Sequence, residues 1–352
     1  MKIVHVSNFP VSKNGAFVFG VPFKLTSGLT RLGHFVANFA DRDVADGYFL
    51  GARKLGAPLA NRQLVRFCRE LRPDLILLGH CCVIAPETIA QLREAVPSVR
   101  IAHWNVDGLF VPRNFMRLAR LAPLVDMTLM TTAGNYLHQI AGFGGRVAYM
   151  PNPVDKAVES LKVFERNDVP NDLVFLCGNK KYNGPRLALC EAIRDGIPEL
   201  KFDARGFWGR PGAYGAEFFD ALGSARMGLS LSARDNVYLY SSDRMAQLMG
   251  CGLLTFIHRA TGFGDLFAED ELVSYADPEE LIAKLHYYRG NDHARRDVAR
   301  RGWARVHADF NETKVAQWIL DATFEGGPRQ SYAWPTDIAD GIANPPSLRV
   351  PA

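Results

Sequence analysis

Residues 241–267 read SSDRMAQLMGCGLLTFIHRATGFGDLF, and this stretch decides the fold. A polar helix start, a Gly-Cys-Gly stop, an apolar strand from Leu253 to Ile257 and a glycine-flanked loop follow one another. Because the strand is apolar on both faces, it is typical of the centre of a parallel sheet. Ligands of such sheets bind at the carboxyl ends of the strands. The hydroxyls, backbone N–H groups and guanidinium of the helix start, 241–244, suit a phosphate there.

The length and charge of the chain limit the classes of protein it can be. Its 352 residues exceed what one hydrophobic core spans, so we expect two domains of roughly 150 to 180 residues each. A net charge of +4 is mildly basic. It suits an anionic small molecule or an anionic membrane surface, and it is far below the charge density of a dedicated nucleic-acid binder. We therefore expect no nucleic-acid partner.

The six cysteines show no CxxC spacing, which argues against a zinc site or a disulfide framework and favours a reducing cytoplasm. The chain opens on MKIVHVS, which resembles a strand rather than a signal peptide. No apolar run reaches the roughly 18 residues that a membrane span needs. We expect a cytoplasmic protein with, at most, peripheral contact at the inner face of the membrane.

Short apolar runs alternate with helical patterns along the chain, as in βαβ units. A break rich in proline, asparagine and charge at Pro151–Asp172 predicts an interdomain linker. We expect an N-terminal domain at 1–155, a C-terminal domain at 156–325 and a proline-rich irregular tail at 326–352. The expected strands are KIVHVS, HFVANFA, DLILLGH, RIAHWNV, DMTLMTT and RVAYMP in the first domain, and DLVFLCGN, LKFDARGF, MGLSLS, LLTFIHR and ELVSYAD in the second.

The segment Arg244 to Val306 resembles the carboxyl-terminal half of GT-B glycosyltransferases, within them the CgeB-type (spore maturation protein) group. The matching pieces are RMAQLMGCG, LLTFIH, DLF, EELIAKLHYY and RRDVARRGWARV. YMPNPVD and GLTRLGHFV resemble family 4 glycosyltransferases more weakly. The resemblance implies an α/β fold of two tandem Rossmann-like doubly wound domains with a cleft between them. It also implies transfer of a sugar from a nucleotide-diphosphate donor, such as a UDP- or GDP-sugar, to a hydroxyl acceptor.

The expected donor-binding residues all belong to the second domain. A glycine lets backbone approach a ligand, and basic side chains neutralise a departing diphosphate. Two alternatives stay open. The loop that begins at Gly178 could be a charged surface turn, and the helix start at Ser241 could be capped and solvated. Where related enzymes place a glutamate on the donor, this chain has an amide, which hydrogen-bonds a hydroxyl but supplies no charge. The candidates are Gly178, Asn179, Lys180, Arg186, Asn236, Tyr240, Ser241, Ser242, Arg244 and Gln247.

The expected catalytic residues follow a strand of the first domain. In AHWNVDG, His103, Asn105 and Asp107 alternate, which places all three on one side of an extended chain. Imidazole and carboxylate suit a base or a sugar-hydroxyl clamp, so we take His103 and Asp107 as catalytic. A buried histidine bonded to backbone is the alternative. His80, after DLILLG, is a second candidate.

Three further patterns complete the prediction. Apart from Asp41-Arg42-Asp43 in the first domain, no DxD pair occurs, and GT-B transferases commonly stabilise the diphosphate with helix ends and basic side chains, so we expect neither a metal nor another cofactor. Asp41-Arg42-Asp43 predicts a local ion-pair turn. The arginines at 295, 296, 300, 301 and 305 predict a solvated helix face, with a lipid-surface patch as the alternative. A nucleotide-sugar epimerase or hydrolase, and a non-catalytic nucleotide-sugar-binding protein, remain alternative functions.

Overall fold

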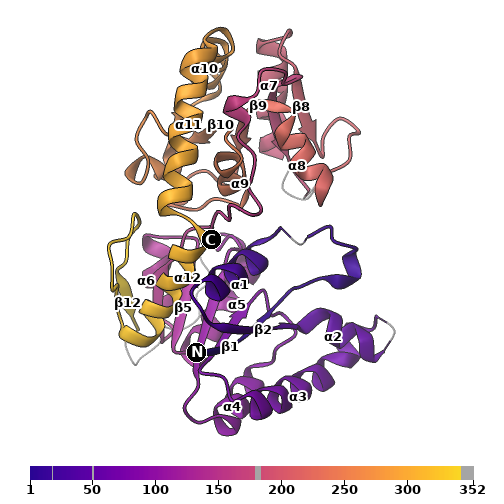
Figure 1. Ribbon diagram of the computed structural model, residues 1–352, viewed down its shortest axis with the longest axis vertical. Coiled ribbons are helices and arrows are strands. Elements are labelled where there is room, and N and C mark those ends of the chain that lie inside the picture. Colours follow the sequence, from indigo (N-terminus) through magenta and orange to yellow (C-terminus); the bar gives the residue numbers. More distant parts are fainter. Residues whose placement is uncertain (18, 50, 179–183, 342–352) are drawn as a thin grey trace. The chain divides into compact units, whose positions relative to one another are not determined.

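The computed structural model describes residues 1–17, 19–49, 51–178 and 184–341, which form two α/β units (Figure 1). Unit 1 comprises Met1–Pro151 together with Glu312–Ala352, and unit 2 comprises Asn152–Asn311. Each unit is built on its own parallel sheet. The predicted tandem of Rossmann-like domains is therefore confirmed.

The sheet of unit 1 has seven strands in the order β12-β6-β5-β4-β3-β1-β2, and only β12 runs antiparallel to its neighbour. The strands are β1 (Lys2–Ser7), β2 (Phe35–Ala40), β3 (Leu75–Gly79), β4 (Arg100–Asn105), β5 (Met127–Met130), β6 (Arg146–Tyr149) and β12 (Ile338–Asp340). The helices are α1 (Val21–Arg31), α2 (Asp41–Tyr48), α3 (Arg53–Leu71), α4 (Pro86–Ala95), α5 (Pro112–Leu121), α6 (Asn135–Ala141) and α12 (Glu312–Leu320).

Helices cover both faces of this sheet. On one face, Leu64 of α3 and Leu92 of α4 pack in a single core with Val6 and Leu78. On the other, His5 of β1 lies against Thr26 of α1. Helices α1 and α12 pack closely enough that a Cβ on Gly28 would overlap the backbone of Glu312. Side chains alternate between the two faces of each strand and therefore pack in two separate layers, as in a doubly wound fold.

The sheet of unit 2 has five parallel strands in the order β11-β10-β9-β7-β8. Helices α7, α10 and α11 share one core with the sheet, and α8 and α9 share another. The strands are β7 (Asn171–Leu176), β8 (Phe202–Arg205), β9 (Ala225–Ser230), β10 (Leu254–His258) and β11 (Val273–Tyr275), and the helices are α7 (Gly184–Gly196), α8 (Ala216–Gly223), α9 (Arg244–Gly250), α10 (Pro278–Gly290) and α11 (Asp292–Asp309).

The predicted linker at Pro151–Asp172 is not a loose connection. Val154 is fully buried in unit 2 and its N–H donates to the carbonyl of Phe310. The carboxylate of Glu159, also fully buried, accepts from the N–H of Asp155. From Asn152 onward the segment therefore belongs to the folded unit 2, and its backbone pairs with both backbone and side-chain groups of that unit.

The end of the chain also differs from the prediction. Helix α12, which we expected in the second domain, packs against α1 in unit 1. Of the proline-rich tail, Trp334 is buried, the Tyr332 hydroxyl donates to Asp321, and β12 extends the sheet beyond β6. Among the described residues, no helix combines the length and apolar character needed to cross a bilayer.

Candidate functional site

Arg244, the first residue of α9, ties the carboxyl ends of two central strands of unit 2. Its Nε donates to the carbonyl of Leu176 (2.7 Å) and its Nη1 to that of Leu231 (2.9 Å). The guanidinium carbon also lies 4.8 Å from the ring centroid of Phe175. Burial, and after it the charge of Arg186, lowers its pKa from 12.5 to about 10. The group remains a cation at neutral pH, held at the edge where parallel sheets bind ligands.

Arg186, in the first turn of α7, provides a second cation at this edge. Its Nε donates to the carbonyl of Ser232 (3.2 Å), and its Nη1 lies 3.5 Å from Cys177 Sγ. Among the described residues, no carboxylate forms an ion pair with Arg186 or Arg244. Asp235 is the nearby acid, and its own burial raises its pKa. Two half-buried cations without a matched anion make this edge attractive to a diphosphate.

The helix start differs from its predicted form. Helix α9 begins at Arg244, so Ser241 and Ser242 precede it, and Asp243 at the cap position makes no side-chain cap. The Ser242 hydroxyl accepts from Arg244, and the carbonyl of Ser241 accepts from Asn152. The two serines therefore shape the approach to the helix. The capped helix start that stood as the alternative is not found at Asp243.

Gln247 lies one turn after Arg244 on the same face of α9. It is half-buried, and its side-chain amide makes no hydrogen bond with any described residue. The surrounding positions Met245, Leu248 and Met249 are buried in unit 2. The helix thus presents one guanidinium and one available amide on its polar face. Such an amide suits a sugar or ribose hydroxyl.

The other predicted donor residues are placed unevenly. Asn236 is exposed, whereas Tyr240 is only 9% exposed. Both belong to the loop between β9 and α9. Gly178 follows β7, and a Cβ there would lie 2.9 Å from the hydroxyl of Tyr214, whose side chain is exposed. Asn179 and Lys180 lie outside the described residues.

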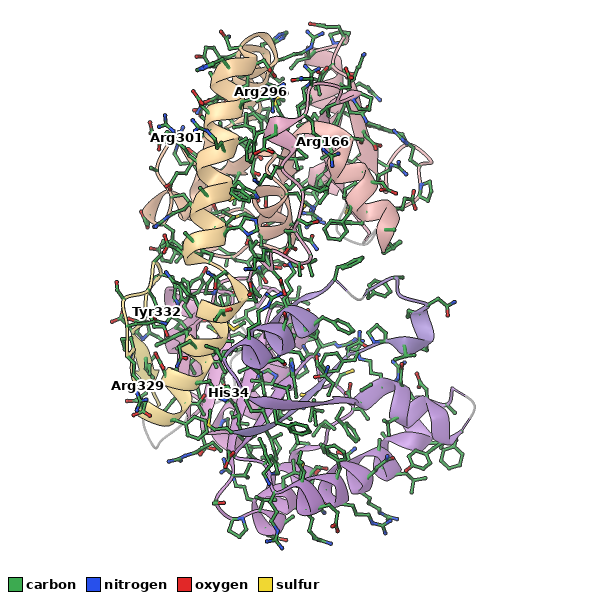
Figure 2. The ribbon with its side chains drawn as sticks, in the orientation of Figure 1. His34, Arg166, Arg296, Arg301, Arg329 and Tyr332 are labelled. Carbon is green, nitrogen blue, oxygen red and sulfur yellow. The ribbon has the colours of Figure 1, made fainter. Side chains whose placement is uncertain are left out.

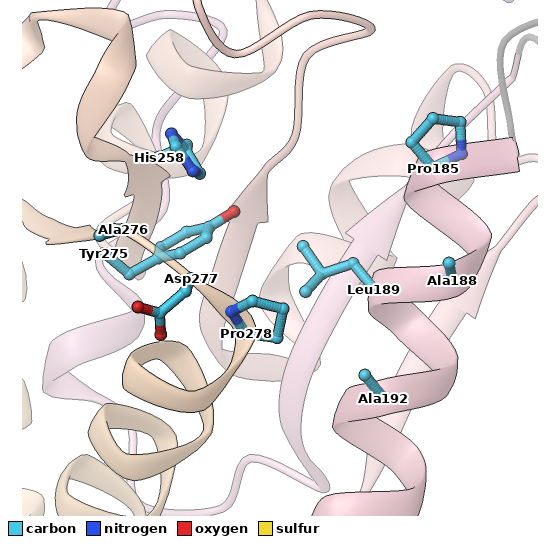
Figure 3. A pocket seen from close by; sticks show the side chains of 9 residues that line it. All are labelled: Pro185, Ala188, Leu189, Ala192, His258, Tyr275, Ala276, Asp277 and Pro278. Carbon is cyan, nitrogen blue, oxygen red and sulfur yellow. The ribbon is translucent and has the colours of Figure 1, made fainter.

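Two hollows are both lined by Pro185 and Leu189 of α7. The smaller, about 240 Å³, is bounded by Arg186 and the loop Leu231–Asp235. The larger, about 450 Å³, lies between α7 and the ends of β10 and β11 (Figure 3). Its lining is mostly apolar, formed by Pro185, Ala188, Leu189, Ala192, His258, Tyr275, Ala276, Asp277 and Pro278.

The polar groups of the larger hollow can read a planar ligand. The Tyr275 hydroxyl is buried and has no hydrogen-bond partner among the described residues. Burial raises the pKa of this hydroxyl, so it acts as a neutral donor or acceptor. His258 Nδ1 accepts from the N–H of Ala260, which leaves the proton of the neutral ring on Nε2. Apolar walls with a few polar groups are typical of small-molecule sites.

In unit 1, His103 lies inside the sheet rather than at its surface. It is 3% exposed, and its Nδ1 has no hydrogen-bond partner among the described residues. Burial, followed by the charge of Arg117, lowers its pKa to about 3. The ring is therefore neutral at physiological pH and a weak base. It can still accept a hydrogen bond from a hydroxyl that reaches it.

Asp107 lies beyond the end of β4, so the expected alternation with His103 and Asn105 stops at Asn105. The Asn105 amide donates to the carbonyl of Asp107 (2.9 Å) and fixes the bend. The Asp107 carboxylate accepts from Arg117 (2.5 Å) and lies 3.7 Å from Nδ1 of His80. His80 adopts a left-handed backbone conformation (φ 49°). The sheet edge therefore brings Asp107 together with His80 and Arg117.

The Asp41-Arg42-Asp43 run does not form the predicted ion-pair turn. It begins α2, and each side chain reaches a different loop. Asp43 accepts from the N–H and hydroxyl of Ser12, and Arg42 donates to the carbonyl of His80. Asp41 is fully buried, and this burial raises its pKa to about 6.

Sequence reasoning missed His258, Tyr275, Arg117 and Asp235. A signal was present for Tyr275, since it ends the apolar run ELVSYAD just before Asp277-Pro278, a helix-start pattern. Residues at that junction lie at the carboxyl edge of a parallel sheet. The contribution of Arg117 depends on a salt bridge across a loop, which no local pattern marks.

Comparisons with known proteins agree with this architecture. Residues 186–321 match a family described as "Glycosyl transferase-like". Sucrose-phosphate synthase from Thermosynechococcus elongatus has a similar structure, with a TM-score of 0.61 and 13% identity over 92% of this chain and 98% of that one. HepE from Anabaena, solved in complex with UDP and glucose, gives a TM-score of 0.56 and 13% identity over 92% and 99%. No match to this chain is found among curated proteins.

These structural likenesses establish the fold alone, because the identities are low. They extend over nearly the whole chain, whereas the family match covers the segment that carries Arg186, Arg244 and Gln247. The chain therefore has the GT-B fold, and its residues 186–321 match the family described as "Glycosyl transferase-like".

Proposed function

We propose that this protein is a glycosyltransferase that moves a sugar from a nucleotide-diphosphate sugar to a hydroxyl acceptor. The observation that carries the proposal is the pair Arg186 and Arg244. Both lie at the carboxyl edge of unit 2 without a paired carboxylate among the described residues, and Arg186 lines the smaller of the two hollows. Two guanidinium groups can stabilise the charge that develops on a leaving diphosphate. We therefore propose a metal-independent reaction.

The donor nucleotide would lie across both hollows. Its base fits the apolar walls at Leu189 and Pro278, with the Tyr275 hydroxyl and His258 Nε2 as polar contacts. Its diphosphate would lie at Arg186 and Arg244, which keep free donor capacity in the planar guanidinium fork. The Gln247 amide would bind a hydroxyl of the sugar or the ribose. A neutral amide is adequate for that contact because no proton is transferred there.

In unit 1 we propose that Asp107 binds and activates the acceptor hydroxyl. Its carboxylate is held by Arg117 and approached by His80, so it is oriented and still about one-third exposed. His103 would accept a hydrogen bond at Nδ1, which has no partner among the described residues. The CgeB-type resemblance and a cytoplasmic location belong to the same proposal.

The test is binding of UDP and GDP, and of their glucose and mannose conjugates, measured by calorimetry. We expect Arg186→Gln to weaken binding of the matching nucleotide at least tenfold, because a hydrogen bond to a charged group contributes about 1.5–3 kcal/mol. Binding of the corresponding nucleoside should change little. Arg194→Gln is the matched control, since Arg194 lies on the same helix, is exposed, and contacts Asp195 and the ring of Trp208, neither of which lines the hollows.

Turnover decides between this proposal and its alternatives. A sugar transferred to a member of an acceptor panel supports it. Free sugar or an epimer formed without acceptor would favour a hydrolase or epimerase. Tight nucleotide-sugar binding without turnover on a broad panel would favour a binding protein. Equal weakening by the Arg186 and Arg194 variants would move the diphosphate elsewhere.

A further inference from the structure

Helix α3 of unit 1 presents a row of cations to solvent. Leu55, Arg62, Arg66 and Arg69 are spaced by seven, four and three residues, so they form one stripe on an α-helix, and all four are exposed. Lys54 is exposed beside this stripe, and Glu70 is the single acid of the helix. Among the described residues, none of these four cations, Lys54, Arg62, Arg66 and Arg69, forms an ion pair.

The second arginine-rich helix of the chain, α11, differs from α3, because its arginines form ion pairs. Arg296 and Arg301 extend from α11 (Figure 2) and pair with Asp292 and Asp270. Its other arginines are also paired, and Arg295 is buried. The lipid-surface alternative considered for these arginines is therefore disfavoured. A face whose charges are internally neutralised has little long-range attraction for an anionic surface.

Apolar side chains accompany the cations of α3. Leu55 is 64% exposed, and Tyr48 and Phe49, at the end of α2, are 44% and 46% exposed. Helix α2 packs against α3, so these residues lie at the turn that leads into the stripe. Exposed large apolar groups next to unpaired cations are typical of helices that lie in the interface of a bilayer.

We propose that the exposed face of α3, together with Tyr48 and Phe49 at the end of α2, forms a docking surface for an anionic lipid bilayer. The four unpaired cations attract the negative headgroups, and Phe49 and Leu55 insert between them. This inference does not depend on the proposed sugar transfer, because it uses no residue of the nucleotide hollows. Membrane attachment would bring the enzyme to acceptors displayed at the membrane.

Charge complementarity alone would also fit a nucleic acid, and the apolar residues favour the bilayer. The exposed leucine on the stripe gains nothing from contact with phosphates but is stabilised when it leaves water for the acyl boundary. The chain as a whole carries 37 acidic residues against 41 basic ones, so the attraction is confined to a local surface.

The experiment is co-sedimentation of the full chain with vesicles of phosphatidylcholine containing phosphatidylglycerol. We expect binding that weakens with added salt and is absent with pure phosphatidylcholine. Arg62→Gln/Arg66→Gln should lower the partition coefficient roughly 30-fold, since each cation near an anionic surface contributes roughly fivefold. Leu55→Ser should lower it roughly fivefold without changing the salt dependence.

The matched control is Arg300→Gln/Arg301→Gln, which removes the same charge from exposed positions of α11. It should leave the partition coefficient within about twofold of the wild type, because those charges are neutralised locally. Failure of the wild type to sediment with anionic vesicles would overturn the proposal. So would equal loss in both double variants. Binding of RNA or duplex DNA that depends on Arg62 and Arg66, without vesicle binding, would reassign the surface to nucleic acid.

Discussion

The carboxyl edge of the sheet is the corresponding position in each unit, but the charges at the two edges differ. In unit 1 the charges are internally matched or suppressed, since Asp107 pairs with Arg117 and His103 is kept neutral by burial. In unit 2 Arg186 and Arg244 stay charged and bond only to neutral groups among the described residues. The difference shows that the topology supplies a polar edge in both units. The side chains placed there decide that one edge attracts an anion while the other offers a shielded carboxylate.

We expect the largest difference between the two units in how their stability changes as the pH is lowered. Burial lowers the pKa values of His5 and His103 to about 3 and that of His80 as well. These rings gain a proton in the unfolded chain from about pH 6.5 downward but not in the folded unit, so stability falls as pH drops. The raised pKa of Asp41, about 6, acts in the opposite sense, because the folded state binds that proton first. By about pH 4.5 the net loss is about 4 kcal/mol.

Hydrogen exchange at neutral pH and at about pH 4.5 measures this for each unit. Amides of β1 and β4 should lose protection before those of β7 and β9. His5→Gln should reduce the effect, because its amide can accept from Trp104, as the ring does, without titrating. His293→Gln, at an exposed position of unit 2, should leave it unchanged. Simultaneous loss of protection in both units would break the comparison.

The next largest difference should be in the contributions of Arg244 and Arg117 to the unfolding free energy. Arg244→Ala leaves the carbonyls of Leu176 and Leu231 without their donor, so we expect a loss of about 2 kcal/mol in unfolding free energy. Arg117→Ala removes a partly exposed ion pair and should cost about 1 kcal/mol or less. Urea unfolding followed by circular dichroism measures both. Arg244→Lys should recover part of the stability and little nucleotide binding, because lysine lacks the planar fork. Equal losses of unfolding free energy for the two alanine variants would mean that the hydrogen bonds of Arg244 contribute no more to stability than the ion pair of Arg117.

The sequence was sufficient for the central strands and insufficient for their edges and ends. All eleven predicted strands form, and most of them are buried on both faces, which requires continuous apolar runs; β2, with one buried residue, is the exception. Strand β12 was missed, since a three-residue edge strand needs neither length nor apolarity. Helix α12 was assigned to the wrong domain, because its packing against Gly28 joins residues far apart in the sequence. The first boundary between the units falls at the start of the predicted linker, but the local polarity at Asp155 and Glu159 does not reveal their burial.

The candidate site was predictable to the extent that it depends on strand ends. Arg186, Arg244 and Gln247 all follow the strands expected to carry ligand groups. What Arg244 does there was not predictable, because one of its carbonyl partners lies 68 residues away. The neutrality of His103 likewise depends on burial by several elements. Local sequence places a side chain at an edge, and tertiary packing sets its charge and its partners.

The smallest expected difference between the two units concerns the side-chain amides of Asn105 and Gln247. The Asn105 amide of unit 1 is occupied, whereas that of Gln247 has no partner among the described residues. Asn105→Ala should therefore cost about 1–2 kcal/mol of stability, and Gln247→Ala less than about 0.5. If the proposed function holds, Gln247→Ala should instead weaken nucleotide-sugar binding about fivefold, the value of one net hydrogen bond. Gln247→Glu should retain binding if the group faces a hydroxyl. A larger loss for glutamate than for alanine, measured by calorimetry, would place Gln247 beside the phosphates and assign the sugar contact to another residue.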